Sequence, residues 1–233
     1  MRALLVIADI SGYTRFMRLH RMSLAHAQEN TASLLRAVIN SAPRLRLVDV
    51  EGDAAFFYVP EPEDQAVAGT IAGLVAGMHL AFHAQQERMN ARNLCLCDAC
   101  AQTGRLRVKF VSHLGDVVAT TIKRTANLAG LDVILAHRLL KNSVPVDEYL
   151  LMTEPVLERC DPDVRGRVES IEEDVEELGP QRLHYLDLSA HAGELPPLPV
   201  PGIAERVFHE AQRTLRSLPY YVGLKRSRFG GIG

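Results

Sequence analysis

Two acidic residues stand where predicted strands end, and they are the residues of this chain best suited to hold metal ions. Asp9 follows the apolar run at residues 2–8, and Asp53 lies in a tight turn after Gly52. Carboxylates at neighbouring strand ends can share divalent cations, and two such cations can clamp a phosphate between its attacking and leaving oxygens. The pair makes nucleotide chemistry the leading hypothesis, against the alternative that both residues only cap turns.

A group of cysteines offers a second kind of metal chemistry. Cys95, Cys97 and Cys100 form a C-x-C-x-x-C pattern, which could supply three thiolate ligands to zinc. The fourth ligand stays open among His113, His79, His83 and Cys160. The alternatives are reduced thiols without a metal and a redox switch. We expect a structural zinc ion, because thiols packed this densely on a loop have little packing rationale.

The composition narrows the class of protein. The chain has 233 residues, 47% of them hydrophobic and 23% charged, with a formal charge of -2, which argues against binding to nucleic acid. No apolar run reaches the roughly 18 residues that span a bilayer, and Asp9 interrupts the apolar start, so we expect a buried strand there. Four cysteines, three of them clustered, do not suggest a secreted disulfide framework. A cytoplasmic location fits best.

The elements that must position these residues follow a recognisable order. Hydrophobic periodicity predicts a strand at 2–8, a helix at 23–40, a hairpin of 45–50 with 54–59, and a long helix at 64–90. Further along it predicts strands at 106–113 and 116–122 turning at Leu114–Gly115, a helix at 131–141, a strand at 149–152, a helix at 154–159 and a strand at 182–188. The acidic stretch 169–177 reads as a solvated strand edge or loop.

This order predicts an α+β fold of the ferredoxin-like type. A β-α-β-β-α-β succession with further elements gives a mixed, mainly antiparallel sheet with helices packed on one face. We expect one domain at 1–190 with a Cys-rich insert at 94–103. A Pro-rich linker at 191–201 and a C-terminal helix with a basic tail at 202–233 would follow.

Four segments in order resemble the catalytic domain of class III adenylyl and guanylyl cyclases. They are residues 8–14 (Ala-Asp-Ile-Ser-Gly-Tyr-Thr), residues 52–57 with Gly-Asp and Phe-Phe, residues 111–117 and residues 130–139. The resemblance covers most of residues 1–188 and implies the nucleotide-cyclase form of the ferredoxin-like fold. More narrowly, the chain resembles an uncharacterised bacterial family within this superfamily, DUF2652, which carries the same cysteine cluster.

The resemblance implies a metal site and a head-to-tail homodimer with active sites at the interface. Asp9 and Asp53, helped by the Ile10 carbonyl, would hold two magnesium or manganese ions. Arg138 of the partner subunit would stabilise charge on the phosphoryl group as the ribose 3′-hydroxyl attacks the α-phosphate and pyrophosphate leaves.

The resemblance also implies nucleotide contacts, and here the chain departs from the family. Backbone amides near Gly12, Tyr13 and Thr14 would meet the triphosphate of ATP or GTP. At the positions that read the base and orient the ribose stand Asp49, Asn127 and Ile134, where the family has Lys for the first and Asn for the last. Asp49 reverses a charge, and Ile134 cannot donate a hydrogen bond.

Two functions therefore stay open. The first is a divergent class III nucleotidyl cyclase-like signalling protein that binds a metal–nucleoside triphosphate and, if active, acts as a purine nucleotide cyclase, a phosphorus–oxygen lyase. The alternative is a catalytically inactive cyclase-homology module for nucleotide sensing, dimerisation or zinc-stabilised protein interaction.

Overall fold

The structure is a computed structural model that describes residues 1–13, 16, 24–61, 63–95, 97–122, 125–190, 201–208, 211, 212 and 215. The predictions for Thr14, for nearly all of the linker at 191–201 and for most of the C-terminal tail lie outside these residues. Among the helices described, none combines the length and the apolar character that a bilayer crossing requires.

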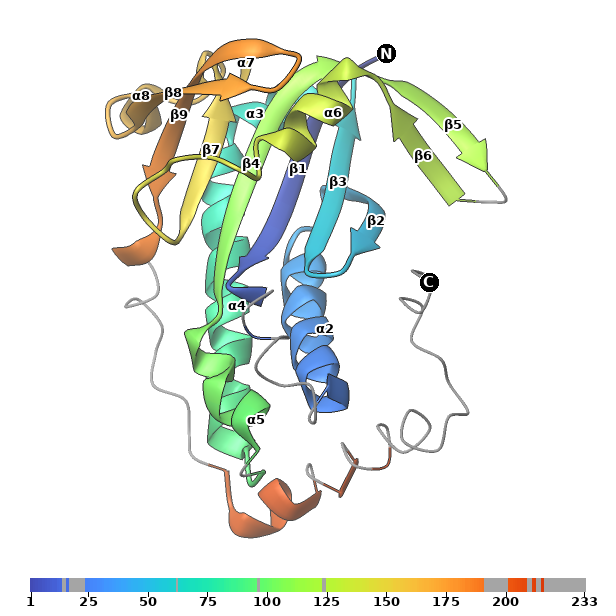
Figure 1. Cartoon of the computed structure of the whole chain (residues 1–233), viewed down its shortest axis with the longest axis vertical. Coiled ribbons are helices and arrows are strands. Elements are labelled where there is room, and N and C mark those ends of the chain that lie inside the picture. Colours follow the sequence, from blue (N-terminus) through green and yellow to red (C-terminus); the bar gives the residue numbers. More distant parts are fainter. Residues whose placement is uncertain are drawn as a thin grey trace.

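A seven-stranded sheet forms the centre of the molecule, in the order β2-β3-β1-β4-β7-β9-β8 (Figure 1). Its ferredoxin-like half consists of β1 (Arg2–Ser11), α2 (Leu24–Ser41), β2 (Arg46–Glu51), β3 (Ala54–Pro60), α3 (Glu63–Gly69), α4 (Ile71–Arg92) and β4 (Arg107–Asp116). The other half adds β7 (Tyr149–Thr153), β8 (Glu169–Val175) and β9 (Gly179–Asp187), with short helices α7 (Glu154–Leu157) and α8 (Pro162–Arg165). Only β4 and β7 pair in parallel, so the predicted mixed, mainly antiparallel α+β sheet is confirmed.

Side chains of β1 alternate between two cores, because successive residues of a strand point to opposite faces. Leu4 and Val6 pack with α2 and α4, whereas Leu5 and Ile7 pack with Ala136 of α6 (Leu131–Arg138). Figure 1 shows α2 and α4 behind the sheet and α6 in front of it. Helices therefore cover both faces, and the expectation of helices on one face was wrong.

The predicted turn at Leu114–Gly115 was also wrong, because β4 runs through it. Residues Leu114 and Gly115 pair with Leu4 and Ala3 of β1. Gly115 serves close packing: a Cβ there would lie 2.3 Å from Cγ of Asp132 on α6. The Asp132 carboxylate accepts a hydrogen bond from the Asp116 amide at 2.6 Å, which fixes α6 against the strand.

After β4 the chain leaves the main sheet. Strands β5 (Val118–Ile122) and β6 (Thr125–Ala129) form a separate antiparallel hairpin, which projects from one side of the molecule (Figure 1). The sequence predicted β5 but not β6. The predicted helix at 64–90 is broken at Thr70 into α3 and α4.

The Cys-rich insert forms a short helical unit below the sheet. It contains α5 (Asp98–Gln102) followed by the 3-10 turn η2 (Thr103–Arg105), and it packs beside α2 and the end of α4. Asn30 of α2 donates a hydrogen bond to Thr103 Oγ1 at 2.7 Å, and both side chains are buried. The insert is thus part of the folded domain.

Candidate functional site

The acidic corner, which we define as Asp9, Asp53 and Lys109, lies where β1 leaves the sheet. Asp9 stands opposite Ala54 of β3 on one side and Lys109 of β4 on the other. Asp53 occupies the two-residue turn between β2 and β3, and its carbonyl accepts a hydrogen bond from the Ile10 amide at 3.1 Å. Gly52 begins this turn at φ 62, a conformation that glycine adopts without strain. The hairpin predicted from the sequence is confirmed, and it brings the two acids together.

Both carboxyl groups are poorly solvated. Burial, and then the negative charge of Asp9, raise the pKa of Asp53 to about 6. Burial also raises the pKa of Asp9, while the Lys109 ammonium opposes that rise. Two carboxylates that disfavour one another's charge are stabilised by any cation placed between them. The corner is therefore suited to a divalent metal ion.

Lys109 is the residue of the acidic corner that sequence reasoning missed. Its Nζ lies 3.3 Å from Oδ2 of Asp9 and donates a hydrogen bond to the Leu140 carbonyl at 2.8 Å. Both partners of the ion pair are largely buried, with 18% and 16% of their side chains exposed. A lysine within an apolar strand was a visible signal, but only the β1–β4 register shows which acid it meets. Lys109 already supplies one positive charge to Asp9.

The turn after β1 carries the residues predicted to meet a triphosphate. Gly12 is exposed with φ 85, and its carbonyl accepts a hydrogen bond from Phe16 at 2.9 Å. Tyr13 is half-buried, and burial together with the charge of Asp53 raises the pKa of its hydroxyl. The side chain of Ile10 is buried. Gly12 and Tyr13 therefore border the acidic corner, whereas Thr14 lies outside the described residues.

The residues predicted to read the base lie on three other elements. Asp49 on β2 is exposed, and its Oδ1 accepts a hydrogen bond from the Val50 amide at 2.7 Å. Asn127 on β6 is exposed, and Ile134 on α6 is 45% exposed. All three side chains are open to solvent or to a second molecule. Among the residues that the structure describes, these three side chains do not form an enclosed pocket around a base.

Arg138, predicted as the catalytic arginine, is held in an ion pair. It donates a hydrogen bond to Oε2 of Glu177 at 2.8 Å. Glu177 lies in the turn between β8 and β9 at φ 61, a backbone conformation that costs a non-glycine residue energy. Arg138 would have to exchange this partner before it could serve a phosphoryl group.

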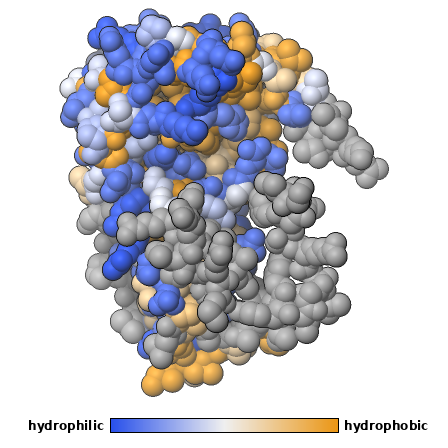
Figure 2. Space-filling view, in the orientation of Figure 1, coloured by the Kyte–Doolittle hydropathy of each residue, from blue (hydrophilic) through white to orange (hydrophobic). Residues whose placement is uncertain are grey.

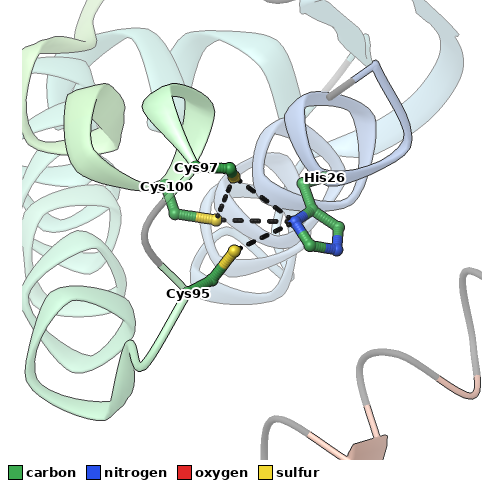
Figure 3. A group of neighbouring side chains, drawn as sticks. All are labelled: His26, Cys95, Cys97 and Cys100. Atoms are coloured by element: carbon green, nitrogen blue, oxygen red, sulfur yellow. Dashed lines mark hydrogen bonds between the residues drawn. The ribbon is translucent and has the colours of Figure 1, made fainter. Parts of the chain in front are cut away.

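The predicted cysteines converge on one point, and the structure adds a histidine that the sequence did not reveal (Figure 3). The Cys3His group consists of His26, Cys95, Cys97 and Cys100, whose four potential ligand atoms all lie within 4.8 Å of one another. His26 lies in the first turn of α2, about seventy positions from the cysteines, so local spacing could not identify it.

The four residues that the sequence offered as the fourth zinc ligand lie elsewhere. His113 contacts Thr153 at 2.9 Å and Asp132 at 3.0 Å. Cys160 is buried and lies 3.4 Å from the Val156 carbonyl, and its burial raises the pKa of the thiol. His79 and His83 belong to another buried cluster.

This second cluster, the His/Glu cluster, consists of His79, His83 and Glu148. The Nε2 atoms of the two histidines lie 3.3 and 2.8 Å from the same oxygen of Glu148. Burial opposes the charge of Glu148, but the hydrogen bonds and charges of the two histidines outweigh it and lower the pKa to about 2. The three ligand atoms could hold a metal ion. The Val108 amide also contacts Glu148, at 3.3 Å, so the carboxylate has partners from the protein itself.

The hydrogen bonds of Gln86 show which ring nitrogen of His83 carries a hydrogen. The Gln86 amide nitrogen donates to the carbonyls of Thr103 and Leu106 at 2.8 and 2.9 Å, so its oxygen must face Nδ1 of His83, 3.2 Å away. Nδ1 therefore carries a hydrogen, and Nε2 faces Glu148. The cluster joins α4, the insert and β4 in one buried network.

The chain has the fold of class III nucleotide cyclase catalytic domains. An adenylyl cyclase of P. aeruginosa, CyaB, is similar with a TM-score of 0.55 and 12% identity over 86% of this chain and 97% of that one. The guanylyl cyclase Cya2 is similar with a TM-score of 0.59 and 15% identity over 79% of this chain and 91% of that one. At these identities the likeness establishes the fold.

The family is narrower than the fold. Residues 31–149 match the family described as "Protein of unknown function (DUF2652)". "Uncharacterized protein Rv2561/Rv2562" of Mycobacterium tuberculosis is 36% identical over 204 residues, which cover 85% of this chain and 92% of that protein. The chain belongs to the DUF2652 family, as its sequence motifs indicated.

Proposed function

We propose that the acidic corner binds a divalent metal ion together with a nucleoside triphosphate, ATP or GTP. The observation that carries the proposal is the placement of Asp9 and Asp53 side by side, with the pKa of Asp53 raised to about 6 by burial and by Asp9. Magnesium and manganese are the ions that carboxylates and phosphates prefer. The Ile10 carbonyl and the exposed turn at Gly12 and Tyr13 are available beside them.

The metal ion would supply charge neutralisation for the phosphates, and the chain would supply positioning. Turnover by such a protein would join the ribose 3′-oxygen to the α-phosphate and release pyrophosphate. A catalytic role for Arg138 requires a conformation in which Glu177 no longer holds it. When the metal–nucleotide complex binds, Lys109 has two possible roles. Its ammonium group leaves Asp9 so that the metal ion can bind there, or it forms an ion pair with the phosphates.

A second function, binding without turnover, is favoured by specific residues. Ile134 offers no hydrogen bond, Asp49 is occupied by a backbone amide of its own strand, and Arg138 is paired within the chain. Losing one preorganised polar contact to a transition state costs about 10²–10³ in rate. A chain that lacks several of these contacts would bind the nucleotide without turnover and act as a sensing or dimerisation module.

We further propose that the active form is a homodimer. Large apolar side chains are exposed on β2, β5 and α6: Leu47 is 42% exposed, Val50 37%, Val118 61%, Leu131 70% and Ile134 45%. Figure 2 shows apolar patches among the polar surface on the face that carries α6 and the β5–β6 hairpin. A second copy laid on this face would cover these side chains and enclose the base-reading residues, which one chain leaves open. Apolar surface of this kind typically marks an interface.

We propose that the protein acts in signalling and is located in the cytoplasm. Support comes from its four cysteines, none of which forms a disulfide and three of which face one histidine, an arrangement that a reducing compartment preserves. The zinc ion expected from those cysteines is proposed separately below.

Thermal unfolding with Mn–ATP and Mn–GTP, followed by analysis for cyclic product, tests the nucleotide proposal. A ligand that binds only the folded chain raises its stability by about 2.7 kcal/mol at one hundred times its Kd. Asp9→Ala and Asp53→Ala should each abolish the metal-dependent part of this gain. Glu61→Gln, an exposed acid at the opposite end of β3, is the matched control and should keep it.

The outcomes separate the two functions. Stabilisation with cyclic product supports the cyclase, and stabilisation without product supports the binding module. Equal titrations in the wild type and both alanine variants would rule out the acidic corner as the metal site.

A further inference from the structure

The Cys3His group joins two distant parts of the chain. His26 belongs to α2, Cys95 to the loop after α4, and Cys97 and Cys100 to the start of α5, where Cys97 is the N-cap residue. Figure 3 shows the three sulfur atoms and Nδ1 of the imidazole all pointing into the same small space. The side chains are half-buried except for Cys100, which is buried.

The distances match a tetrahedral ion and not a set of hydrogen bonds. Nδ1 of His26 lies 3.5 Å from Sγ of Cys95, 3.5 Å from Sγ of Cys97 and 3.7 Å from Sγ of Cys100. With zinc–sulfur and zinc–nitrogen bonds of about 2.3 and 2.05 Å, a tetrahedron sets nitrogen and sulfur about 3.6 Å apart. One imidazole nitrogen has a single hydrogen or a single lone pair, so it cannot bond three sulfurs at once. A shared cation accounts for all three separations.

The sulfur atoms exclude a disulfide in this arrangement. The Sγ atoms of Cys97 and Cys100 are 3.2 Å apart, well beyond the bond length of about 2.05 Å, and none of the four cysteines forms a disulfide. For zinc this pair would widen by about half an ångström, a shift that side-chain rotation can supply.

The backbone around the cysteines is held in place without the metal. The Asn93 side chain brackets Cys95 with two 3.0 Å hydrogen bonds, one to its carbonyl and one from its amide. The carbonyl of Cys97 accepts hydrogen bonds from the amides of Cys100 and Ala101, both at 3.1 Å. A loop built in this way presents its three sulfurs in one direction before any ion binds.

We propose that His26, Cys95, Cys97 and Cys100 form a closed structural zinc site. Three thiolates and a neutral imidazole are ligands that zinc prefers, and four protein ligands leave no open position for catalysis. The ion would tie the first turns of α2 to the insert that follows α4. Because α2 follows the turn at Gly12 and Tyr13, the zinc ion would anchor the far end of the segment that leaves the acidic corner.

Elemental analysis of the full chain, purified under reducing conditions with zinc in the medium, tests the proposal. We expect about one zinc ion per chain, and we expect cobalt to replace it with the visible spectrum of a tetrahedral thiolate site. His26→Ala and Cys95→Ser should each weaken zinc binding by at least tenfold, measured by competition with a chromogenic chelator. Cys160→Ser removes a thiol outside the group and should leave zinc binding unchanged.

The proposal fails if the reduced wild type holds no zinc, or if His26→Ala binds zinc as tightly as the wild type. His26→Cys guards against a variant that merely misfolds, because it keeps four ligands and should retain zinc while the cobalt spectrum shifts toward four thiolates. None of these outcomes depends on nucleotide, so they test the zinc site independently of the function of the acidic corner.

Discussion

The acidic corner and the Cys3His group differ in where their compensating charge comes from. At the acidic corner the chain provides part of it, because Lys109 lies 3.3 Å from Asp9 while Asp53 keeps a pKa raised to about 6. In the Cys3His group the sulfur atoms of the three cysteines lie 3.5–3.7 Å from Nδ1 of His26. A corner that is partly neutralised can bind and release a cation, whereas a closed set of thiolates binds one tightly as part of the folded structure. The first arrangement suits function and the second suits structure.

Removing zinc is the change with the largest expected effect. An ion present at a thousand times its Kd adds about 4 kcal/mol to the stability of the folded state. We therefore expect a strong chelator to lower the melting temperature of the wild type well beyond its effect on Cys95→Ser, which lacks a ligand. The measurement is thermal unfolding with and without chelator.

The same experiment on Asp53→Asn sharpens the comparison. The chelator should lower its melting temperature as much as that of the wild type, because the acidic corner takes no part in the zinc site. A chelator effect that disappears in Asp53→Asn but persists in Cys95→Ser would reverse the two assignments.

Local signals in the sequence were enough for the acidic corner but not for its lysine. The hairpin at Gly52–Asp53 and the end of the first strand are short-range features, so Asp9 and Asp53 could be placed together before the structure was known. Lys109 and His26 depend on strand register and on how a helix meets a loop, which no spacing in the sequence records. Gly115 shows the opposite error: a glycine that reads as a turn is there because Asp132 approaches the strand.

Replacing Lys109 should have an intermediate effect, at the acidic corner alone. In Lys109→Met the ammonium beside Asp9 is lost while the aliphatic stem remains. We expect manganese affinity to rise about tenfold, equivalent to about 1.4 kcal/mol, because the cation no longer competes with the lysine. Isothermal titration with manganese chloride measures it, and Lys141→Met, at an exposed lysine after α6, is the control.

Titration with Mn–ATP then shows what else Lys109 does. If Lys109 only competes with the metal, the nucleotide complex should also bind more tightly to Lys109→Met. Weaker binding of the complex, despite tighter binding of manganese, would show that the lysine turns to the phosphates. Unchanged manganese affinity would mean that Lys109 contributes no charge to the metal site.

The smallest effect concerns the charge of Asp53 without metal. A carboxyl group whose folded pKa is raised destabilises the native state as pH rises from its usual value of 3.8 through about 6. Asp53→Asn escapes this cost, so it should be as stable as the wild type near pH 4. Above pH 7 it should be more stable by about 1 kcal/mol, a value reduced because solvent screens a half-buried group.

A divalent metal ion should reverse the relative stability of the wild type and Asp53→Asn. With manganese in excess, the wild type gains binding energy that Asp53→Asn lacks, so the variant becomes the less stable protein above pH 7. Urea unfolding at several pH values, with and without manganese, measures both signs, and Glu61→Gln controls for the loss of one surface charge. If the two proteins kept parallel stabilities from pH 4 to pH 8 in both conditions, Asp53 would not carry a perturbed charge. The proposal that the acidic corner binds a metal ion would then lose its physical basis, while the proposed zinc site would be unaffected.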